Sequence, residues 1–354
     1  MSYALGVPAA WEFTRKLLLA LAPKMEQAGH RHDWLPYLER ATDLSEQLGD
    51  LASAAEFMLQ RGILHRLLSE FGLAKSQLEH SIALCERIAA PRRQARALNE
   101  LAWVESLQNQ TITAAQLVDH ALVLLDVNDP ERAMCYRVQG MLAIAHAQWS
   151  EAEVLHRQAL AIFEKQGDAR KVAWSLQNLA YALRGQERFE EAIGYYAQAA
   201  ESLWYLGDHY NWSIVQVNLG LAYHYSGRPA LAVDRYLEAK SIPGYLCDTF
   251  HLARIHLNIG LSYLTLQLFA EAEEAFGAAI RLHRESGVTF WRLNAMDGLA
   301  MTYIGWGKFA QASTVLEQAI KELPTIVGVP YYEYLFRSLH QHLEEAHKGE
   351  IELV

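Results

Sequence analysis

The 354-residue sequence predicts an all-α solenoid of about eight helical hairpins. The main observation is a column of small residues that recurs every 40 positions, with one interval of 38. Its members are Ala22, Gly62, Ala102, Gly140, Ala180, Gly220, Gly260 and Ala300. Two further columns lie 12 and 19 positions later, and Trp34 is the only large residue in them. Helices approach within about 8 to 10 Å only where their side chains are short, so these columns mark helix–helix contacts.

Glycine, proline and aspartate divide the repeats into helices. Around the columns, apolar residues recur at i, i+3, i+4 and i+7, which is the pattern of an amphipathic helix. Turns between the two helices of a hairpin are predicted at Gly185–Phe189, Gly227–Pro229 and Gly307–Phe309. Successive hairpins are joined at Gly-Asp pairs, where glycine ends one helix and aspartate caps the next, at residues 49–50, 167–168 and 207–208.

In chain order, the sequence is interpreted as one domain, residues 1–354, with eight repeats and a terminal helix. The repeats span residues 9–50, 51–90, 91–130, 131–168, 169–208, 209–248, 249–288 and 289–328, and the capping helix spans 330–348. The first repeat carries Pro23 inside its first helix and Trp34 in a small column, as expected of an end repeat that packs on one side only. The last helix, roughly Tyr331 to His347, is rich in charged residues and is predicted to be the polar cap.

The composition limits the classes of function. The chain has 31 Lys and Arg against 41 Asp and Glu, and this net charge of −10 argues against nucleic-acid binding. Three separated cysteines, Cys85, Cys135 and Cys247, indicate a reducing compartment. The longest early apolar run, Leu17–Ala22, is too short to span a membrane. We therefore expect a cytoplasmic protein that binds neither nucleic acid nor a membrane.

Three consecutive repeats share a signature of asparagine, a small residue and a later aromatic. It is Asn178-Leu179-Ala180 with Tyr196, Asn218-Leu219-Gly220 with Tyr236, and Asn258-Ile259-Gly260 with Phe276. Over about residues 9 to 328 the chain resembles the tetratricopeptide repeat (TPR) family. This resemblance implies a right-handed superhelix whose concave side is lined by the first helix of each hairpin. The period exceeds the family's usual ~34 residues, which is typical of an extended class found in peptide-binding scaffolds and in sensor regions of STAND-type signalling ATPases.

A candidate binding face follows from the helical period. At 100° per residue, positions −6, −3, −2, +1, +4 and +5 from the small column fall on one side of the first helix. The candidate ligand-binding residues on this face are Arg96, Asn99, Trp103, Arg137, Trp174, Gln177, Asn178, Tyr181, Arg184, Asn218, His224, Tyr225, Arg254, Asn258 and Asn294. With Arg66, five arginines stand against Glu56, Glu100 and Asp297. The balance of +2 favours an anionic or amide-rich ligand.

Asn178, Asn218 and Asn258 take the same position in three repeats. Because an amide both donates and accepts, such a row can pair with the main chain of an extended peptide whatever its sequence. Similar asparagines in extended TPR scaffolds hold peptide main chain, as the resemblance implies. The alternative is that each asparagine bonds a neighbouring helix, and that the arginines pack their stems or pair with local acids.

No motif predicts catalysis, a cofactor or a metal. Gly305–Lys308 lacks the upstream glycine of a phosphate-binding loop and is followed by Phe309. His340, Glu344 and His347 share a helical face, but no fourth metal ligand is apparent. No serine or cysteine stands beside a histidine and an acid in a convincing arrangement.

The sequence therefore predicts a non-enzymatic recognition domain. Residues 35–50 resemble the opening of TPR sensor regions in STAND-type ATPases, where the sensor follows a nucleotide-binding module. The resemblance implies a sensor that binds a peptide, a protein or a small anionic effector, with a linked or associated NTPase or regulatory module. The alternative is a constitutive scaffold that holds a partner without signalling, and a weaker one is self-assembly through the convex side or the ends.

Overall fold

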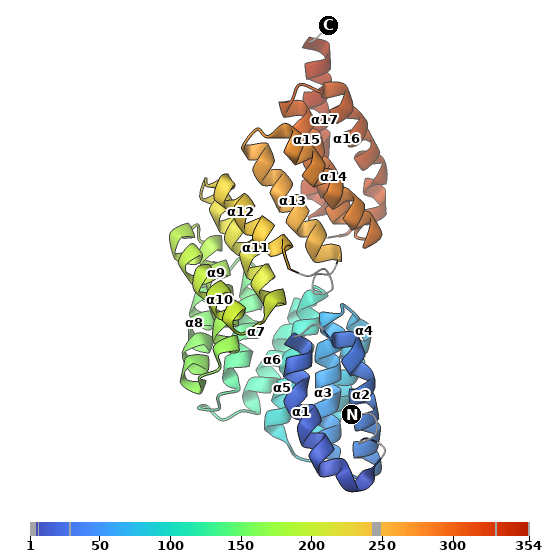
Figure 1. The fold of residues 1–354 in the computed structure, drawn as a ribbon, viewed down its shortest axis with the longest axis vertical. Helices are drawn as coiled ribbons and strands as arrows, with labels where there is room; N and C mark the ends of the chain where they lie inside the picture. The colour runs from blue at the N-terminus through green and yellow to red at the C-terminus, as the bar shows by residue number, and fades with distance from the viewer. Residues whose placement is uncertain (1–4, 6, 28–29, 243–248, 330, 353–354) are drawn as a thin grey trace. The chain divides into compact units, whose positions relative to one another are not determined.

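The computed structural model describes residues 5, 7–27, 30–242, 249–329 and 331–352 (Figure 1). In this part of the chain the regular structure is α-helical, with short 3-10 turns and no β-strand. The chain divides into two compact units, Met1–His209 and Tyr210–Val354, called unit 1 and unit 2 below. The predicted all-α class is confirmed.

The helices follow one another in pairs, as expected of a solenoid of hairpins. Those of unit 1 are α1 (Trp11–Gln27), α2 (Arg31–Gln47), α3 (Leu51–Leu67), α4 (Phe71–Arg87), α5 (Pro91–Leu107), α6 (Thr111–Val123), α7 (Arg132–Ala145), α8 (Trp149–Gln166), α9 (Ala169–Gly185) and α10 (Phe189–Tyr205). Helix α11 (His209–Tyr225) begins at the last residue of unit 1. The others of unit 2 are α12 (Pro229–Lys240), α13 (Thr249–Thr265), α14 (Phe269–Glu285), α15 (Thr289–Gly305), α16 (Phe309–Glu322) and α17 (Tyr332–Glu352).

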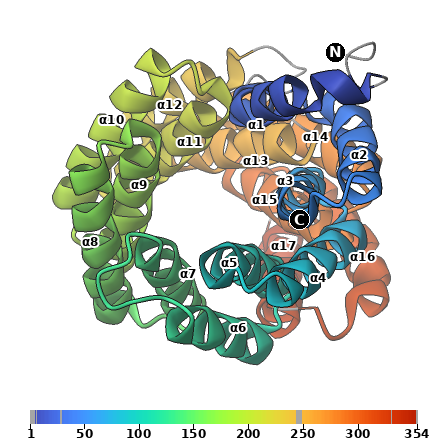
Figure 2. The same ribbon diagram turned by 90° about the horizontal axis from the view of Figure 1, so that it is seen from below.

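Odd-numbered helices form one layer within each unit. In unit 1, α1 contacts α3, α3 contacts α5, α5 contacts α7, and α7 contacts α9, although a whole helix separates each pair in sequence. Figure 2 shows α5, α7 and α9 along the inner side of a curved row, with α6, α8 and α10 outside. In unit 2, α13 and α15 are in contact in the same way. The predicted first helix of each hairpin therefore belongs to a separate layer, which carries the candidate binding face.

The first small column fits a large side chain that lies 16 positions later on the partner helix. A methyl group added at Gly140 would come within 2.6 Å of the His156 ring, and one added at Gly220 within 2.4 Å of Tyr236. Both rings are buried. The small residues are therefore required by close packing within each hairpin.

The joints between hairpins are capped as predicted. Gly49 and Gly167 adopt φ angles of 72° and 67°, in the left-handed region that glycine tolerates. Asp50 and Asp168 then accept hydrogen bonds from the backbone N–H three residues later, each at 3.1 Å. The turn predicted at Gly185–Phe189 is confirmed, since α9 ends at Gly185 and α10 begins at Phe189. Within it, Glu187 takes the left-handed position with φ 61°, while Gly185 lies against the Trp149 indole.

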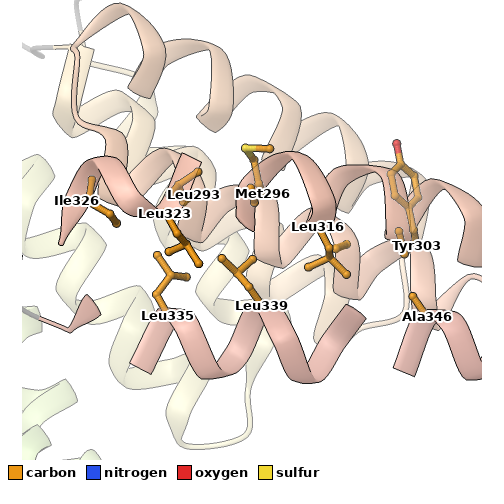
Figure 3. Close-up of a cluster of buried hydrophobic side chains, with 12 residues drawn as sticks. Leu293, Met296, Tyr303, Leu316, Leu323, Ile326, Leu335, Leu339 and Ala346 are labelled. Carbon is orange, nitrogen blue, oxygen red and sulfur yellow. The ribbon is translucent and has the colours of Figure 1, made fainter. Parts of the chain in front are cut away.

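The last helix closes the apolar core of unit 2. Leu335, Leu339 and Ala346 of α17 are fully buried against α15 and α16 (Figure 3). The helix spans Tyr332–Glu352, so it extends beyond the predicted end at residue 348, where Gly349 lies close to the Phe309 ring and Ser313 donates a hydrogen bond to Glu350 at 2.8 Å. None of the described helices combines the length and the apolar character needed to cross a lipid bilayer.

Candidate ligand-binding surface

All the candidate residues lie on odd-numbered helices, and we call the surface that these helices carry within each unit the odd-helix face of that unit. In unit 1 they are Arg96, Asn99 and Trp103 on α5, Arg137 on α7, and Trp174, Gln177, Asn178, Tyr181 and Arg184 on α9. In unit 2 they are Asn218, His224 and Tyr225 on α11, Arg254 and Asn258 on α13, and Asn294 on α15. Most are buried or half-buried, whereas Tyr225 is 60% exposed.

Five side chains of unit 1 form a continuous stack, which we call the Arg–Trp stack: Arg66 on α3, Trp103 on α5, Arg137 on α7, and Trp174 and Arg170 on α9. The Cζ atoms of Arg66 and Arg137 lie 4.3 and 4.0 Å from the Trp103 ring centroid. Those of Arg137 and Arg170 lie 5.0 and 4.5 Å from the Trp174 ring. Guanidinium groups at these distances are attracted to the electron-rich ring faces. Three candidate residues from three repeats are thus in direct contact.

The two outer arginines of the stack have carboxylate partners. Arg66 Nε donates to Glu100 at 3.1 Å. Arg170 Nε donates to the buried Asp208 at 2.6 Å, and its Nη2 donates to Glu26 of α1 at 3.2 Å. Both guanidinium groups are therefore compensated within the protein.

Arg137, in the middle of the stack, has no such compensation. Its side chain is only 5% exposed, and Nε has no hydrogen-bond partner among the described residues. Its one hydrogen bond is a long contact of 3.8 Å from Nη1 to Met134 Sδ. Burial lowers the pKa of Arg137 to about 9, because the charged guanidinium loses hydration and the charge of the nearby Glu100 carboxylate offsets this loss only in part.

Two residues around the stack were not among the candidates. Arg170 lies ten positions before Ala180, outside the positions assigned to the binding face. Glu26 lies four positions after Ala22, which is the position of Arg66 in the next repeat. Extending the same register to the first repeat identifies Glu26, whereas no local signal identifies Arg170.

Arg96 is already occupied by an acid of the protein. Its two Nη atoms donate to the two carboxylate oxygens of Glu56 at 2.9 and 3.0 Å, and Arg93 adds a third contact at 3.3 Å. Burial opposes the charge, but the Glu56 carboxylate outweighs it and raises the pKa of Arg96 above its usual value. Arg184 instead stacks on Tyr181, with Cζ 4.6 Å from the ring centroid.

Two of the amide candidates, Asn99 and Asn258, have unfilled hydrogen-bonding capacity. Asn258 is 7% exposed and its Nδ2 has no partner among the described residues. Asn99 donates to Cys135 Sγ at 3.3 Å, while its buried Oδ1 has no partner in that part of the chain. Asn218 is 9% exposed, and Asn178 is half-buried. Buried amides normally satisfy both groups, so Asn99 and Asn258 are costly without an external partner.

A buried array of Ser213, His251 and Arg254 lies in unit 2. Arg254 Nη2 donates to His251 Nδ1 at 3.0 Å, so in the neutral ring Nε2 carries the proton and donates to Ser213 Oγ at 3.0 Å. The serine hydroxyl in turn donates to the Ala239 carbonyl at 2.9 Å. This tautomer is the reverse of the one that activates a serine nucleophile, because His251 donates to Ser213 instead of accepting its proton.

The last acid of the odd-helix face is covered by α17. Asp297 is 6% exposed and accepts hydrogen bonds from Ser338 at 2.6 Å and His342 at 2.7 Å. The hydrogen bond to the Asp297 carboxylate raises the pKa of His342. Asp297 is therefore used to hold the terminal helix.

Among the described residues there is no candidate metal site, and the two cysteines are buried. No group of three or more His, Cys, Asp or Glu side chains there is arranged to hold a metal ion. Cys85 and Cys135 are buried free thiols, and burial raises the pKa of Cys135 to about 11, which keeps it protonated. Cys247 lies outside the described residues.

Comparison with known structures shows the same fold. A Rap protein complexed with competence and sporulation factor has a TM-score of 0.62 and 14% identity, over 95% of this chain and 99% of that chain. NprR in complex with its cognate peptide NprX has a TM-score of 0.57 and 13% identity, over 82% and 84%. A STAND protein with a tetratricopeptide repeat sensor, from Pyrococcus horikoshii, has a TM-score of 0.67 and 14% identity, over 92% of this chain and 52% of that one.

No curated protein matches the sequence. The family model for the tetratricopeptide repeat matches residues 131–203, 171–242 and 251–321, slightly more than half of the chain. These segments contain the hairpins α7/α8 to α15/α16, with their small columns and capped joints. This chain belongs to the tetratricopeptide repeat family.

Proposed function

We propose that this chain is a non-enzymatic recognition domain that binds an extended peptide along its odd-helix face, as the sensor part of a STAND-type regulatory protein. The observation that carries the proposal is the buried amide of Asn258, whose Nδ2 has no partner in the described chain, at the same repeat position as Asn178 and Asn218. A peptide main chain supplies a carbonyl and an N–H at each residue, which suits such amides.

The comparisons support this proposal. Two of the similar structures are named as complexes, of a Rap protein with competence and sporulation factor and of NprR with the peptide NprX. A third is named as a STAND protein with a TPR sensor. The buried Ser213–His251–Arg254 array, in its non-catalytic tautomer, fits a binding domain better than an enzyme.

The binding proposal is tested by selecting ligands from a displayed library of 12-residue peptides. A selected synthetic peptide is then titrated into wild type and into Asn218→Ala/Asn258→Ala by calorimetry. Losing two hydrogen bonds of about 1 kcal/mol each should weaken binding about 30-fold. Gln311→Ala, at an exposed position on α16, is the control and should bind like wild type.

Two results would contradict this proposal. One is a double variant that binds the peptide as tightly as wild type. The other is a double variant whose helical signal and melting are lost, which would show that the asparagines hold the fold rather than a ligand.

A sensor and a constitutive scaffold differ in what binding does to the solenoid. Because each repeat contacts mainly its neighbours, a peptide that bridges several repeats can change the pitch of the stack. Small-angle X-ray scattering with and without the selected peptide should show a changed radius of gyration for a sensor. An unchanged scattering curve at saturation would favour the scaffold.

A further inference from the structure

We propose that the middle of the Arg–Trp stack is a carboxylate-binding site, in which Arg137 receives a carboxylate of the ligand. The inference rests on the proposed function, because it assigns the anchoring group of the ligand that binds the odd-helix face. It starts from the pattern within the stack, where Arg66 and Arg170 each hold a carboxylate of the protein and Arg137 holds none.

The cost of burying Arg137 supports an external partner. A guanidinium that is 5% exposed, with a buried and unpartnered Nε, has lost hydration without a compensating acceptor. The contacts to Trp103 and Trp174 provide attraction but no hydrogen-bond acceptor. A bound anion would supply the acceptor that the protein omits.

The geometry favours a planar carboxylate. Arg137 lies between two indole rings, with Cζ at 4.0 and 5.0 Å from their centroids, on helices α5 and α9 that lie on either side of α7. The rings offer no hydrogen-bond acceptor, so an acceptor has to reach the N–H groups of the guanidinium, which lie in its plane. A carboxylate pairs with the guanidinium fork in that plane through two parallel hydrogen bonds, and because a phosphate can also pair with the fork, the two anions are compared directly in the test.

The charges around Arg137 are largely directed at other partners. His156, which lies near Arg137, has a pKa lowered to about 3 by burial and by the arginine charge, so it is neutral. Glu100 is engaged by Arg66 at 3.1 Å, and Arg170 already bridges Glu26 and Asp208. The cluster as a whole is balanced in charge, and Arg137 is the arginine in it that has no direct carboxylate contact among the described residues.

The test uses small probes, so that its failure is distinct from failure of the peptide selection. N-acetylglycine, its neutral amide and inorganic phosphate are titrated at constant ionic strength into ¹⁵N-tryptophan-labelled full-length protein. The indole resonances are assigned with Trp103→Phe and Trp174→Phe. We expect saturable shifts of both indoles with N-acetylglycine and none with the amide.

Variants of Arg137 complete the test. Arg137→Gln should abolish the shifts, and Arg137→Lys, which keeps the charge but loses the fork, should weaken the probe about tenfold or more. Arg157→Gln, which removes an arginine on the outer helix α8, should respond like wild type. If Arg137→Gln does not fold, the lysine variant and the three probes on wild type still decide.

Three outcomes would overturn the proposal. The first is an equal response to the neutral amide, and the second is a persisting response in Arg137→Gln. The third is a response to phosphate that equals or exceeds the response to N-acetylglycine, which would assign a general anion site instead.

Discussion

The odd-helix faces of the two units are built on the same repeat but carry different chemistry. In unit 1 the face contains Glu56, Arg66, Arg96, Glu100, Arg137 and Arg184, and most of these charges are paired or stacked. In unit 2 it contains only Arg254 and Asp297, and both contact other residues of the unit. The rest of that face is amide, aromatic and apolar.

The difference shows how the solenoid separates packing from recognition. The small columns and the large residue 16 positions later recur in both units, so the hairpins are held in one way throughout. The odd-helix faces differ although this packing is shared. The proposed carboxylate site lies in unit 1, whereas Asn218 and Asn258, two of the asparagines proposed to bind peptide main chain, lie in unit 2.

The largest expected effect tests whether both units share one packing register. Ala152 in unit 1 and Ala232 in unit 2 are both fully buried between the helices of a hairpin. Tryptophan at either position should overpack the contact and lower the free energy of unfolding by about 3 kcal/mol or more. Denaturant titration measures this, with exposed Ala230→Trp as the control. Tolerance of tryptophan at only one of the two sites would show that the registers differ.

The next effect concerns a histidine buried in unit 1 where unit 2 has an aromatic ring. His156 is fully buried against Gly140 with both nitrogens unpartnered among the described residues, while Phe276 lies against Gly260 at the same repeat position. His156→Phe should therefore stabilise the protein by about 1 kcal/mol at pH 7, because two unsatisfied polar atoms are removed.

The pH dependence of the same variant follows from the pKa of His156, which is lowered to about 3. The unfolded histidine, with a pKa near ~6.5, binds a proton that the folded one does not, so stability is lost as pH falls from about 6.5 toward 3. At pH 5 the variant should gain about 2 kcal/mol more. Urea titrations at the two pH values measure this gain, and exposed His120→Phe should not show it. An identical pH dependence in His156→Phe and wild type would contradict the assignment.

A smaller effect tests whether the charges of unit 1 support its fold. Glu56→Gln removes the carboxylate that holds the Arg96 fork and Arg93. Because the Arg96 side chain is 39% exposed, solvent offsets part of the loss, and we expect about 1 to 2 kcal/mol. Hydrogen exchange should rise in α3 and α5 and stay unchanged in unit 2. Glu12→Gln, at an exposed pair with Lys16, should leave stability as in wild type.

The smallest effect should be equal in the two units. Gly194 in α10 has nothing within 4 Å of an added methyl group, and at Gly277 in α14 the nearest atom is Arg281 Nη1 at 3.6 Å. Alanine at either position should stabilise the protein by about 0.5 to 1 kcal/mol, since glycine lowers helix stability. Thermal melting measures the gain. Destabilisation by either substitution would show that outer helices pack differently from the structure.

The sequence predicted those parts of the fold that depend on local spacing. The 40-residue period predicted the hairpins, and the Gly-Asp pairs predicted the helix caps at Asp50 and Asp168. Both features depend on residues that are near one another in the chain. The turn at Gly185–Phe189 was also predicted, but the contact of Gly185 with Trp149 was not, because glycine can serve either a turn or close packing. Local spacing does not distinguish these two uses.

The candidate surface was less accessible to sequence reasoning. The helical period placed Trp103, Arg137 and Trp174 on one face, but their mutual stacking depends on distances between repeats that no single helix determines. Arg96 and Glu56 are 40 positions apart, which is one repeat, so the repeat period could have indicated that they pair. The pairing of Arg170 with Glu26, across 144 residues, depends on the curvature of unit 1.

That last contact changes how unit 1 is expected to come apart. An array whose members contact only their neighbours loses end repeats one at a time, and fraying at one terminus costs little elsewhere. The ion pair between α1 and α9 joins the first hairpin to the fifth. The first hairpin therefore contacts both its neighbour in sequence and a hairpin four repeats away. Release of the first hairpin then requires breaking a contact at both of its sides. The amino-terminal end, which in an open array would be the first to unravel, is anchored at a distance by the same arginine that terminates the stack.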